Sequence, residues 1–328
     1  MRLDRSQIVQ GLIAILGAAK VDTDEQVLKE NSHDRFRKLE SIFGIYSCPL
    51  PAAVVRPESA LEVSKILKYL NENQIACIPR TGGSATEGGL EVVRQPTVVI
   101  DGSRMNRTIK IDPTNMLVTA QCGVNLEALE NQLRASGFTT GHSPQSKPLA
   151  QMGGLVATRS IGQFSTLYGG IEDMVVGLEA VFPNGEITRI KNVPRRACGP
   201  DIRHVIIGNE GALCFITEVT LKMFKYQPEN NLYFGFALPA MKPGFDLLRQ
   251  VMTEGYRPSV ARLYDPEDGK QHGFHRFAPG KSVLIFMTEG PKGISQATGE
   301  AILELASQCF GAERVDSSII ERWFTHLN

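Results

Sequence analysis

A glycine-rich run that begins at Pro79 holds the residues best suited to binding chemistry. It reads Pro-Arg-Thr-Gly-Gly-Ser-Ala-Thr-Glu-Gly-Gly over residues 79–89 and follows an apolar run at 75–78. Glycine has no Cβ, so it can adopt φ > 0 and let neighbouring backbone amides converge on an anion. The run therefore favours a phosphate or pyrophosphate site, with Arg80 adding positive charge. From this run alone, a surface turn of small polar residues is the alternative.

The run departs from the two common phosphate-binding templates. No Gly-x-Gly-x-x-Gly motif opens a helix here, and no Lys-Ser or Lys-Thr pair follows Gly88 and Gly89, as a P-loop requires. The sequence therefore argues against a nucleoside triphosphate hydrolase, and the ligand has to be identified from other segments.

Two further segments are rich in glycine. Residues 141–162 form a long run of small and polar residues, followed by Tyr168 and Gly169. Residues 208–220 join two apolar runs through a turn that contains glycine. A compact domain rarely keeps so long an irregular stretch without a function. Three such segments in one domain indicate an extended ligand that several loops hold.

In this order the three segments resemble the FAD-binding domain of the vanillyl-alcohol oxidase superfamily, also called the PCMH-type flavoproteins. The runs at 158–160, 168–173 and 199–211 are most similar to alkyldihydroxyacetonephosphate synthase and to bacterial FAD-linked oxidoreductases related to glycolate oxidase and D-lactate dehydrogenase. The resemblance is strong over residues 45–226 and weak elsewhere. It implies an α+β fold, in which a PCMH-type FAD-binding domain of two α/β subdomains precedes an incomplete ferredoxin-like substrate domain of the FAD-linked oxidase C-terminal type.

The resemblance also implies which residues bind FAD. The residues expected around the pyrophosphate are Pro79, Arg80, Thr81, Gly82, Gly83, Ser84 and Ala85. Those expected beside the flavin and the ribityl chain are Gln145, Ser146, Lys147, Pro148, Leu149, Ala150, Gln151, Gly153, Gly154, Thr158, Arg159, Ser160 and Ile161. Those expected to close over the adenine side are Glu210, Gly211, Ala212, Leu213, Cys214, Phe215 and Ile216.

The chain departs from the family pattern at two places. Several relatives carry a histidine, covalently bonded to the flavin, where this chain has Ser84. Serine has no nucleophilic ring nitrogen, so we expect FAD to be bound without a covalent bond. In the closing turn the family reads Glu-Gly-Thr-Leu-Gly, whereas this chain has Ala212 and Cys214 at the third and fifth positions. A hydroxyl is lost at Ala212 and a side chain is added at Cys214, so these two changes affect the residues expected to close over the adenine side.

Sequence patterns outside the motifs predict a mixed fold in three parts. Apolar runs at 52–56 and 75–78 flank an amphipathic helix at 59–72, which gives a β-α-β opening that leads into the glycine-rich run. Asn184-Gly185 joins two further strands as a hairpin. We expect an N-terminal helical segment over residues 1–44, the FAD-binding domain over 45–226 and the substrate domain over 227–328.

At the N-terminus, apolar residues at helical spacing favour a helix of the mature protein over a signal peptide. Arg2 and Arg5 precede the apolar run, as in a signal peptide, but Asp4 argues against one. We expect Ser6 to cap this helix and Gly17 to end it.

Arg262 is the candidate substrate-binding residue in the second domain. It lies in a run at 259–265 that resembles an active-site strand of alkyldihydroxyacetonephosphate synthase, and a guanidinium can hold a carboxylate or phosphate through two hydrogen bonds. The alternative is an exposed or ion-paired arginine on an edge strand. His272 and His275 have the spacing of a metal pair, but glycine and proline place them in a loop without carboxylates, so we expect no metal site. His142 and Tyr168 are expected near the flavin, with no proton-transfer role assigned to either.

The charge balance and the cysteines limit the class of protein. Lys plus Arg and Asp plus Glu each total 35, so no net field would attract nucleic acid or an anionic membrane. Six cysteines are scattered without a Cys-x-x-Cys pair, which favours buried, reduced thiols in a cytoplasmic protein without a transmembrane segment. No iron–sulfur cluster is expected.

These features together favour an FAD-linked oxidoreductase that transfers a hydride from a 2-hydroxy acid or related polar alcohol to flavin N5. Two alternatives stay open, a flavin-dependent transferase like alkyldihydroxyacetonephosphate synthase and a catalytically incomplete FAD-binding fragment. Family members continue beyond residue 328 to further catalytic residues, so the chain is expected to be C-terminally truncated or completed by a partner. The substrate is a small molecule, the electron acceptor is unknown, and a homodimer or an electron-transfer partner is left open.

Overall fold

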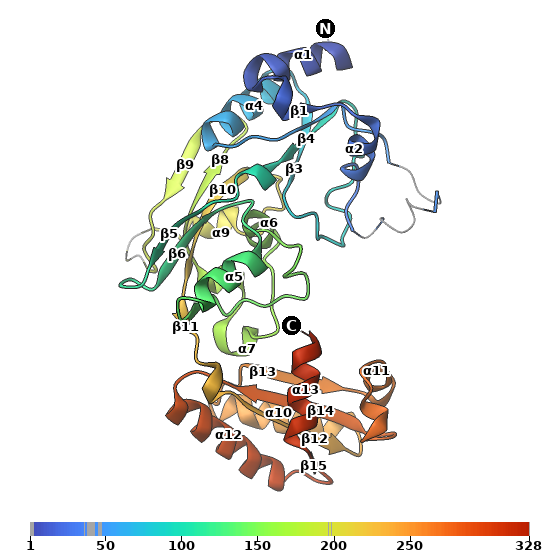
Figure 1. The fold of residues 1–328 in the computed structure, drawn as a ribbon, viewed down its shortest axis with the longest axis vertical. Coiled ribbons are helices and arrows are strands. Elements are labelled where there is room, and N and C mark those ends of the chain that lie inside the picture. Colours follow the sequence, from blue (N-terminus) through green and yellow to red (C-terminus); the bar gives the residue numbers. More distant parts are fainter. Residues whose placement is uncertain are drawn as a thin grey trace. The chain divides into compact units, whose positions relative to one another are not determined.

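The computed structural model describes residues 3–35, 37, 43–44, 48–195, 197 and 199–327 (Figure 1). The chain forms two compact units that do not follow each other in sequence. Unit 1 contains residues 1–133, 146–160 and 171–223, and unit 2 contains residues 134–145, 161–170 and 224–328. The expected boundaries at residues 45 and 227 stay a prediction. Unit 2 also includes residues 134–145 and 161–170, which lie within the expected FAD-binding domain.

The predicted N-terminal helix is α1 (Arg5–Leu16), but its cap differs from the expectation. Asp4, not Ser6, is the N-cap. The Asp4 carboxylate accepts the Gln7 N–H at 2.8 Å, and the Gln7 side chain accepts the Asp4 N–H at 3.0 Å. This reciprocal capping box satisfies two backbone donors at once. Gly17 ends the helix as predicted, with φ of 82°. A short helix, α2 (Glu25–Glu30), follows with Asp24 as its N-cap.

The first sheet of unit 1 carries the glycine-rich loop. Its strand order is β1 (Val21–Asp22), β2 (Ala53–Val55), β4 (Thr97–Asp101) and β3 (Ala76–Arg80). Strands β2, β3 and β4 are parallel, and the predicted helix α4 (Ala60–Glu72) connects β2 to β3. The loop begins where β3 ends, at the carboxyl edge of parallel strands, where α/β sheets commonly bind ligands.

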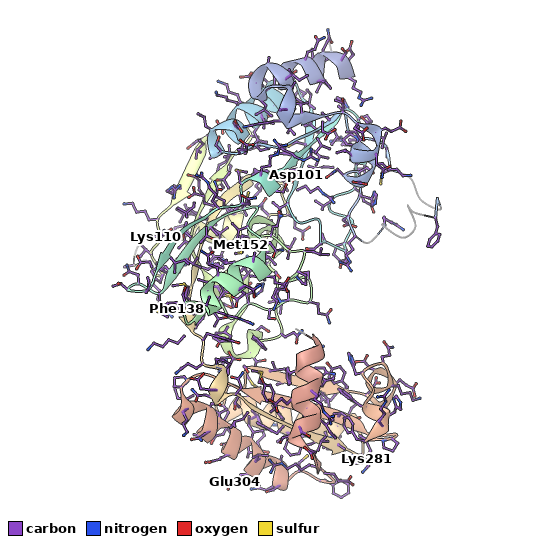
Figure 2. The ribbon with its side chains drawn as sticks, in the orientation of Figure 1. Asp101, Lys110, Phe138, Met152, Lys281 and Glu304 are labelled. Atoms are coloured by element: carbon purple, nitrogen blue, oxygen red, sulfur yellow. The ribbon has the colours of Figure 1, made fainter. Side chains whose placement is uncertain are left out.

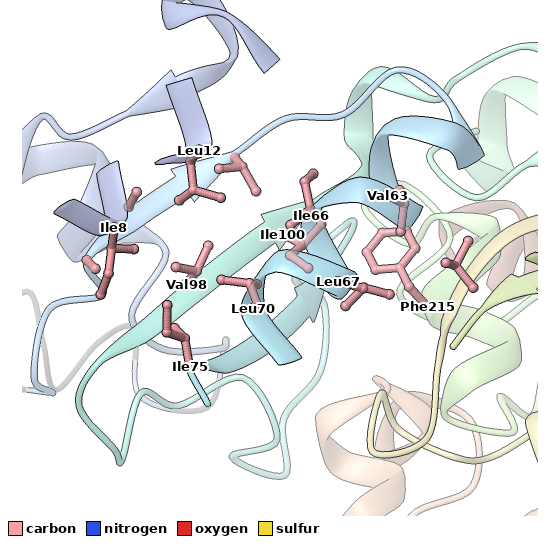
Figure 3. Packing of buried hydrophobic residues seen from close by; sticks show 14 of the residues in the cluster. Ile8, Leu12, Val63, Ile66, Leu67, Leu70, Ile75, Val98, Ile100 and Phe215 are labelled. Carbon is pink, nitrogen blue, oxygen red and sulfur yellow. The ribbon is translucent and has the colours of Figure 1, made fainter. Parts of the chain in front are cut away.

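The core beneath this sheet joins α1 and α4. Ile8 and Leu12 of α1 pack with Ile66 and Leu70 of α4 and with Val98 of β4 (Figure 3). All five side chains are at most 1% exposed. The spacing of four residues between the paired positions on each helix presents one apolar face to the sheet. This packing fixes β3, and therefore the start of the loop.

The second sheet of unit 1 is antiparallel throughout. Its order is β5 (Thr108–Asp112), β6 (Leu117–Gln121), β10 (Phe215–Lys222), β8 (Val175–Val181) and β9 (Ile187–Ile190). The predicted hairpin is β8 and β9. The helices of this region are α5 (Leu126–Arg134), α6 (Met152–Ala157), α8 (Ile171–Met174) and α9 (Arg203–Ile206). Met152 is fully buried, whereas Lys110 on β5 is exposed (Figure 2).

Unit 2 contains a ferredoxin-like β-α-β-β-α-β motif, and all six elements are present. They are β12 (Leu232–Leu238), α10 (Met241–Thr253), β13 (Val260–Tyr264), β14 (Ser282–Thr288), α12 (Lys292–Ser307) and β15 (Glu313–Val315). The antiparallel order β13-β14-β12-β15 is the order of that motif. The family resemblance implied this motif, whereas β15 by itself carries no strong strand pattern in the sequence.

Each face of this sheet has its own apolar cluster. On one face, Phe234, Phe236 and Phe286 pack with residues of α10 and α12. On the other, Val260 and Ile285 pack with α13 (Ser317–Leu327). The segments 134–145 and 161–170 also belong to this unit. The first contributes β7 (Phe138–Thr139), which pairs with β11 (Phe224–Lys225), and the second contributes α7 (Ser165–Tyr168). Within the described part of the chain, every helix is too short or too polar to cross a membrane.

Candidate functional site

The predicted binding segments of unit 1 meet around a cavity of about 290 Å³. The cavity is bounded by the loop after β3, by α6 with the residues around it, and by the turn that enters β10. Its lining residues are Pro79, Arg80, Thr81, Gly82, Gly83, Ser84, Ala85, Thr86, Glu87, Gly89, Leu90, Ser146, Gln151, Gly153, Gly154, Leu155, Ala157, Thr158, Ser160, Glu210, Gly211, Cys214, Phe215 and Ile216.

Close backbone contact explains the glycines of this cavity. A Cβ at Gly82 would lie 2.2 Å from the Leu149 carbonyl oxygen, and a Cβ at Gly154 would lie 2.9 Å from Thr81 Oγ1. Gly83 has φ of 61°, a conformation that L-residues with side chains rarely adopt. The sequence placed these glycines beside a ligand, and the structure adds that they also let the loop lie directly on residues 149–154.

The chemistry of the lining suits a large polar cofactor with phosphates. Backbone amides and the hydroxyls of Ser84, Ser146 and Ser160 supply hydrogen-bonding groups, and Leu155 with Ile216 adds apolar surface. The Gln151 Oε1 atom is buried and has no hydrogen-bond partner in the described part of the chain. A buried polar atom of this kind normally has a partner. The lining therefore fits FAD, with hydroxyls and amides for its polar edges and an apolar wall for its rings.

Several residues that the sequence predicted to bind FAD do not line this cavity. They are Gln145, Lys147, Pro148, Leu149, Ala150, Arg159, Ile161, Ala212 and Leu213. Gln145 and Ile161 belong to unit 2. The Pro148 carbonyl accepts a hydrogen bond from Asn125 Nδ2 at 3.0 Å, which directs this stretch of backbone toward the start of α5. Lining residues that the sequence did not predict are Thr86, Glu87, Gly89, Leu90, Leu155 and Ala157. The available signal was that Leu155 and Ala157 lie between predicted residues and that the other four follow directly after the predicted run 79–85.

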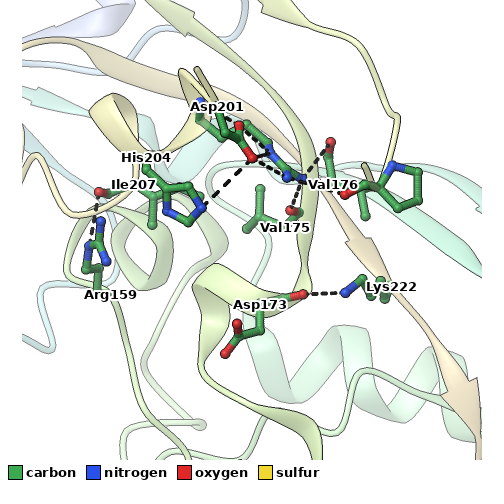
Figure 4. A network of polar contacts seen from close by, with 10 residues as sticks. Arg159, Asp173, Val175, Val176, Asp201, His204, Ile207 and Lys222 are labelled. Carbon is green, nitrogen blue, oxygen red and sulfur yellow. Dashed lines mark hydrogen bonds and ion pairs between the residues drawn. The ribbon is translucent and has the colours of Figure 1, made fainter. Parts of the chain in front are cut away.

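Arg159 contacts the neighbouring turn at residues 207–210. Its Nε–H donates to the Ile207 carbonyl at 3.3 Å, and a Cβ at Gly208 would lie 2.5 Å from the Arg159 Nε (Figure 4). Two backbone hydrogen bonds, from Gly208 N–H to Val156 O and from Glu210 N–H to Ala157 O, lie alongside at 3.0 Å each. The arginine therefore fixes the turn at 207–210 that forms one wall of the cavity.

A second polar network supports the same wall from α9. The Arg203 guanidinium donates to Asp201 Oδ1 at 2.9 Å and to the Val175 carbonyl at 2.8 Å (Figure 4). Hydrogen bonding to Arg203 lowers the pKa of Asp201 to about 2. In the same view, Lys222 Nζ donates to the Asp173 carbonyl at 2.6 Å. The acidic residues at 173 and 201, which carried part of the family resemblance, therefore lie in contacts that hold strands β8 and β10 to adjacent loops.

The cysteines that the structure describes form no disulfide with one another. Cys48, Cys77, Cys122, Cys214 and Cys309 are free thiols, and Cys198 lies outside the described residues. Only Cys214 among these five lines the cavity. Burial raises the pKa of Cys214 to about 11, so the thiol is protonated and unreactive at neutral pH.

Unit 2 places Arg262 beside aromatic side chains on β13. The guanidinium carbon of Arg262 lies 5.2 Å from the Tyr264 ring centroid and 5.7 Å from that of Trp323, on α13. Arg262 Nη1 and the Tyr264 hydroxyl are both buried, and neither has a hydrogen-bond partner among the residues that the structure describes. Burial raises the pKa of Tyr264 to about 12, which keeps the phenol neutral and able to donate. Two unsatisfied donors thus lie on one strand, on residues that point to the same face.

The other histidines and tyrosines named from the sequence have structural contacts. His272 packs against the Tyr264 ring at 4.7 Å, and His275 is exposed in the short helix 274–276. Within the described ranges, no three His, Cys, Asp or Glu side chains are grouped to hold a metal ion. His142 is 1% exposed, and burial lowers its pKa to about 4. The Tyr168 hydroxyl donates to Glu289 Oε1 within unit 2.

Comparison with known proteins identifies the family that the chain resembles. The FAD binding domain family matches residues 51–191. The whole chain is 65% identical to "Uncharacterized FAD-linked oxidoreductase YgcU" of Escherichia coli (strain K12) and spans 68% of that protein. It is 30% identical over 298 residues to a mitochondrial D-lactate dehydrogenase [cytochrome] of Arabidopsis thaliana, which covers 89% of this chain and 50% of that protein. A solved structure of alkyldihydroxyacetonephosphate synthase matches with a TM-score of 0.85 at 27% identity, over 98% of this chain and 62% of that one.

These matches confirm the fold and the cofactor that the glycine-rich segments predicted. The α+β architecture is that of the PCMH-type flavoproteins, and FAD is the cofactor. The residues of the cavity fit that cofactor, while their individual contacts with it stay a prediction. The chain belongs to the family of FAD-linked oxidoreductases that carry a PCMH-type FAD-binding domain.

Proposed function

We propose that this chain binds FAD without a covalent bond and takes part in the oxidation of a 2-hydroxy acid or a related polar alcohol. The observation that carries the proposal is the pair of buried, unsatisfied donors on β13, Arg262 Nη1 and the Tyr264 hydroxyl. The similarity to a protein named D-lactate dehydrogenase supports the same substrate class. When bound, FAD would supply the redox chemistry as the acceptor, at flavin N5, of a hydride from the carbon that bears the hydroxyl.

In this proposal unit 2 recognises the acid group of the substrate. A guanidinium matches the geometry of a carboxylate and remains charged at every working pH. The neutral Tyr264 phenol adds a second donor. The rings of Tyr264 and Trp323 surround the guanidinium and reduce competition from water, which strengthens a charged hydrogen bond. Together they would bind and orient an α-hydroxy carboxylate.

In unit 1 we assign the cofactor to the cavity. Residues 79–85 would hold the pyrophosphate through backbone amides, Gln151, Gly153 and Gly154 would lie beside the flavin, and residues 210–216 would close over the adenine side. The free thiols and the absence of a spanning helix among described residues are compatible with a cytoplasmic location, which we propose as well.

The test is anaerobic reduction of the FAD-loaded chain by a panel of 2-hydroxy acids, followed at the flavin absorption bands. We expect at least one acid to bleach the flavin. Arg262→Met should raise the half-saturating acid concentration by about tenfold or more, since a charged hydrogen bond is lost. Arg257→Met is the matched control, because Arg257 is exposed in the adjacent loop. An equal response of both variants would reject the role of Arg262.

A flavin-dependent transferase is the second candidate, favoured by the structural match to alkyldihydroxyacetonephosphate synthase. The acidic group of the substrate of such a transferase would be a phosphate, which Arg262 can also bind. In that case an acyl-dihydroxyacetone phosphate would change the flavin spectrum while the hydroxy acids would not. If neither class of compound changes the spectrum of bound FAD, the chain as given binds the cofactor without completing a reaction.

A further inference from the structure

Residues 32–35, here called the N-terminal clip, lie against the glycine-rich loop although they are distant from it in sequence. The Arg35 N–H donates to the Ala85 carbonyl at 3.0 Å, and the Val92 N–H donates to the Ser32 carbonyl at 2.8 Å. The clip lies outside residues 51–191, which the FAD binding domain family matches. Ser32 and Asp34 are each 2% exposed and His33 is 9% exposed, so these three residues are buried within unit 1, whereas Arg35 is exposed.

Asp34 makes the most specific contact between the clip and the loop. Its Oδ2 atom accepts the Gly88 N–H at 2.7 Å, and Asp34 is only 2% exposed. Gly88 has φ of 81°, and its carbonyl accepts the Glu91 N–H at 3.1 Å, so the Asp34 carboxylate contacts the first residue of this turn. A buried carboxylate is costly unless hydrogen bonds or charges compensate it. The buried Asp34 carboxylate therefore indicates that its hydrogen bond to Gly88 stabilises the conformation of the glycine-rich loop.

Arg80 connects the clip to the paired glycines. Its Nη1 atom donates to the His33 carbonyl at 3.0 Å, and a Cβ at Gly83 would lie 2.5 Å from Nη2. Burial lowers the pKa of Arg80, and the charges of Asp101 and Asp34 oppose that shift. The guanidinium thus lies between the clip and Gly83, lining the cavity from beneath the loop. At the far end of the loop, Arg37 Nε lies 3.3 Å from Glu91 Oε1.

We propose that the N-terminal clip is part of the cofactor site, with Asp34 as a positioning residue that sets the glycine-rich loop in its FAD-binding conformation. The inference rests on the assignment of residues 79–85 to the pyrophosphate. Backbone amides bind a pyrophosphate only when they converge, and a loop fixed beforehand avoids the ordering cost on binding. Asp34 never needs to touch FAD to have this effect.

The experiment measures the FAD dissociation constant of apoprotein variants by flavin fluorescence, alongside the thermal midpoint of each apoprotein. Asp34→Ala should raise the FAD dissociation constant by about tenfold or more, because a charged hydrogen bond to the loop is lost. Asp34→Asn, whose amide oxygen can still accept the Gly88 N–H, should fall between the wild type and Asp34→Ala. Asp24→Ala is the matched control, because Asp24 also accepts a backbone N–H, from Val27 at 3.1 Å, but caps α2 instead.

A purely structural role would lower the thermal midpoint in both alanine variants and leave the FAD dissociation constant unchanged. Ser84→Glu tests the assignment of residues 79–85 to the pyrophosphate separately from the role of the N-terminal clip. A carboxylate at the cavity should repel the pyrophosphate. If Ser84→Glu weakens FAD binding while Asp34→Ala does not, the clip has no part in the cofactor site. If neither weakens it, the loop assignment itself is wrong. Should Asp34→Ala not fold, an unchanged dissociation constant in Asp34→Asn overturns the proposal.

Discussion

The Tyr168 phenol donates a hydrogen bond to the Glu289 carboxylate, and the two residues are 121 positions apart. The Tyr168 ring lies 4.6 Å from that of Phe224, and a Cβ at Gly141 would lie 2.5 Å from the Tyr168 ring. Tyr168 belongs to a motif that the sequence assigned to flavin binding. In the structure it fastens residues 161–170 and 134–145 to the end of β14 in unit 2.

Removing this hydrogen bond should destabilise unit 2. Tyr168→Phe should lower the free energy of unfolding by about 1.5–3 kcal/mol, the range for a hydrogen bond to a charged group. In a double-mutant cycle with Glu289→Gln, the double variant should lose less than the sum of the two single losses. Urea unfolding followed by circular dichroism measures all three. Tyr69→Phe is the control, because the Tyr69 hydroxyl is 3.5 Å from its acceptor; additive losses at 168 and 289 would refute the coupling.

Gly82 and Gly89 should respond differently to the same substitution. A Cβ at Gly82 would meet the Leu149 carbonyl at 2.2 Å, whereas the nearest atom to a Cβ at Gly89 is Glu210 Oε2 at 3.8 Å. Gly82→Ala should therefore displace the loop and raise the FAD dissociation constant by about tenfold or more, with Gly89→Ala close to the wild type. Fluorescence titration with FAD compares them. Equal affinities would mean that the backbone approach at Gly82 does not shape the site.

Bound FAD should be released by acid. Ser84 stands where several relatives carry the histidine that bonds to the flavin, and serine offers no ring nitrogen. After loading with FAD and desalting, the protein should be yellow, and acid precipitation should leave the flavin absorbance in the supernatant. Yellow colour in the washed pellet would show a covalent bond from another residue. The spectrum of the desalted protein also shows whether residues 1–328 retain the cofactor.

His142 should make unit 2 sensitive to acid. Burial lowers its folded pKa from 6.5 to about 4, so the unfolded chain binds the proton more tightly. This contribution to stability is complete above pH 6.5 and is lost as the pH falls toward 4. Between pH 7 and 5 the unfolding free energy should drop by about 2 kcal/mol more in the wild type than in His142→Gln. His275→Asn, at an exposed position, should keep the wild-type slope; a parallel decline in all three proteins would exclude His142.

Local sequence patterns predicted much of the fold and the glycine-rich loop of the candidate site. The helix at 59–72 and the strands at 52–56 and 75–78 have clear patterns, and the glycines of residues 79–89 indicated a site where backbone amides converge on a ligand. The capping residue of α1 was misassigned because Asp4 and Ser6 are both good caps, and the choice depends on which donors the folded chain leaves open.

Contacts between distant segments could not be predicted in this way. No local pattern links Asp34 to Gly88 or Tyr168 to Glu289, because each pair forms only when separate elements pack. The same holds for the hydrogen bond from Arg159 to the Ile207 carbonyl, while the place of Arg159 beside the flavin stays a prediction. Polar residues in loops are the hardest to assign, since their partners are set by tertiary structure alone.

The division of unit 2 into three separate stretches has a consequence during synthesis. Residues 134–145 and 161–170 leave the ribosome before residues 224–328, which supply the remainder of that unit. At typical translation rates, β7 waits several seconds for β11, its pairing partner, to emerge. Phe138 and Tyr168 therefore stay exposed on a nascent chain whose flavin-binding half is nearly finished.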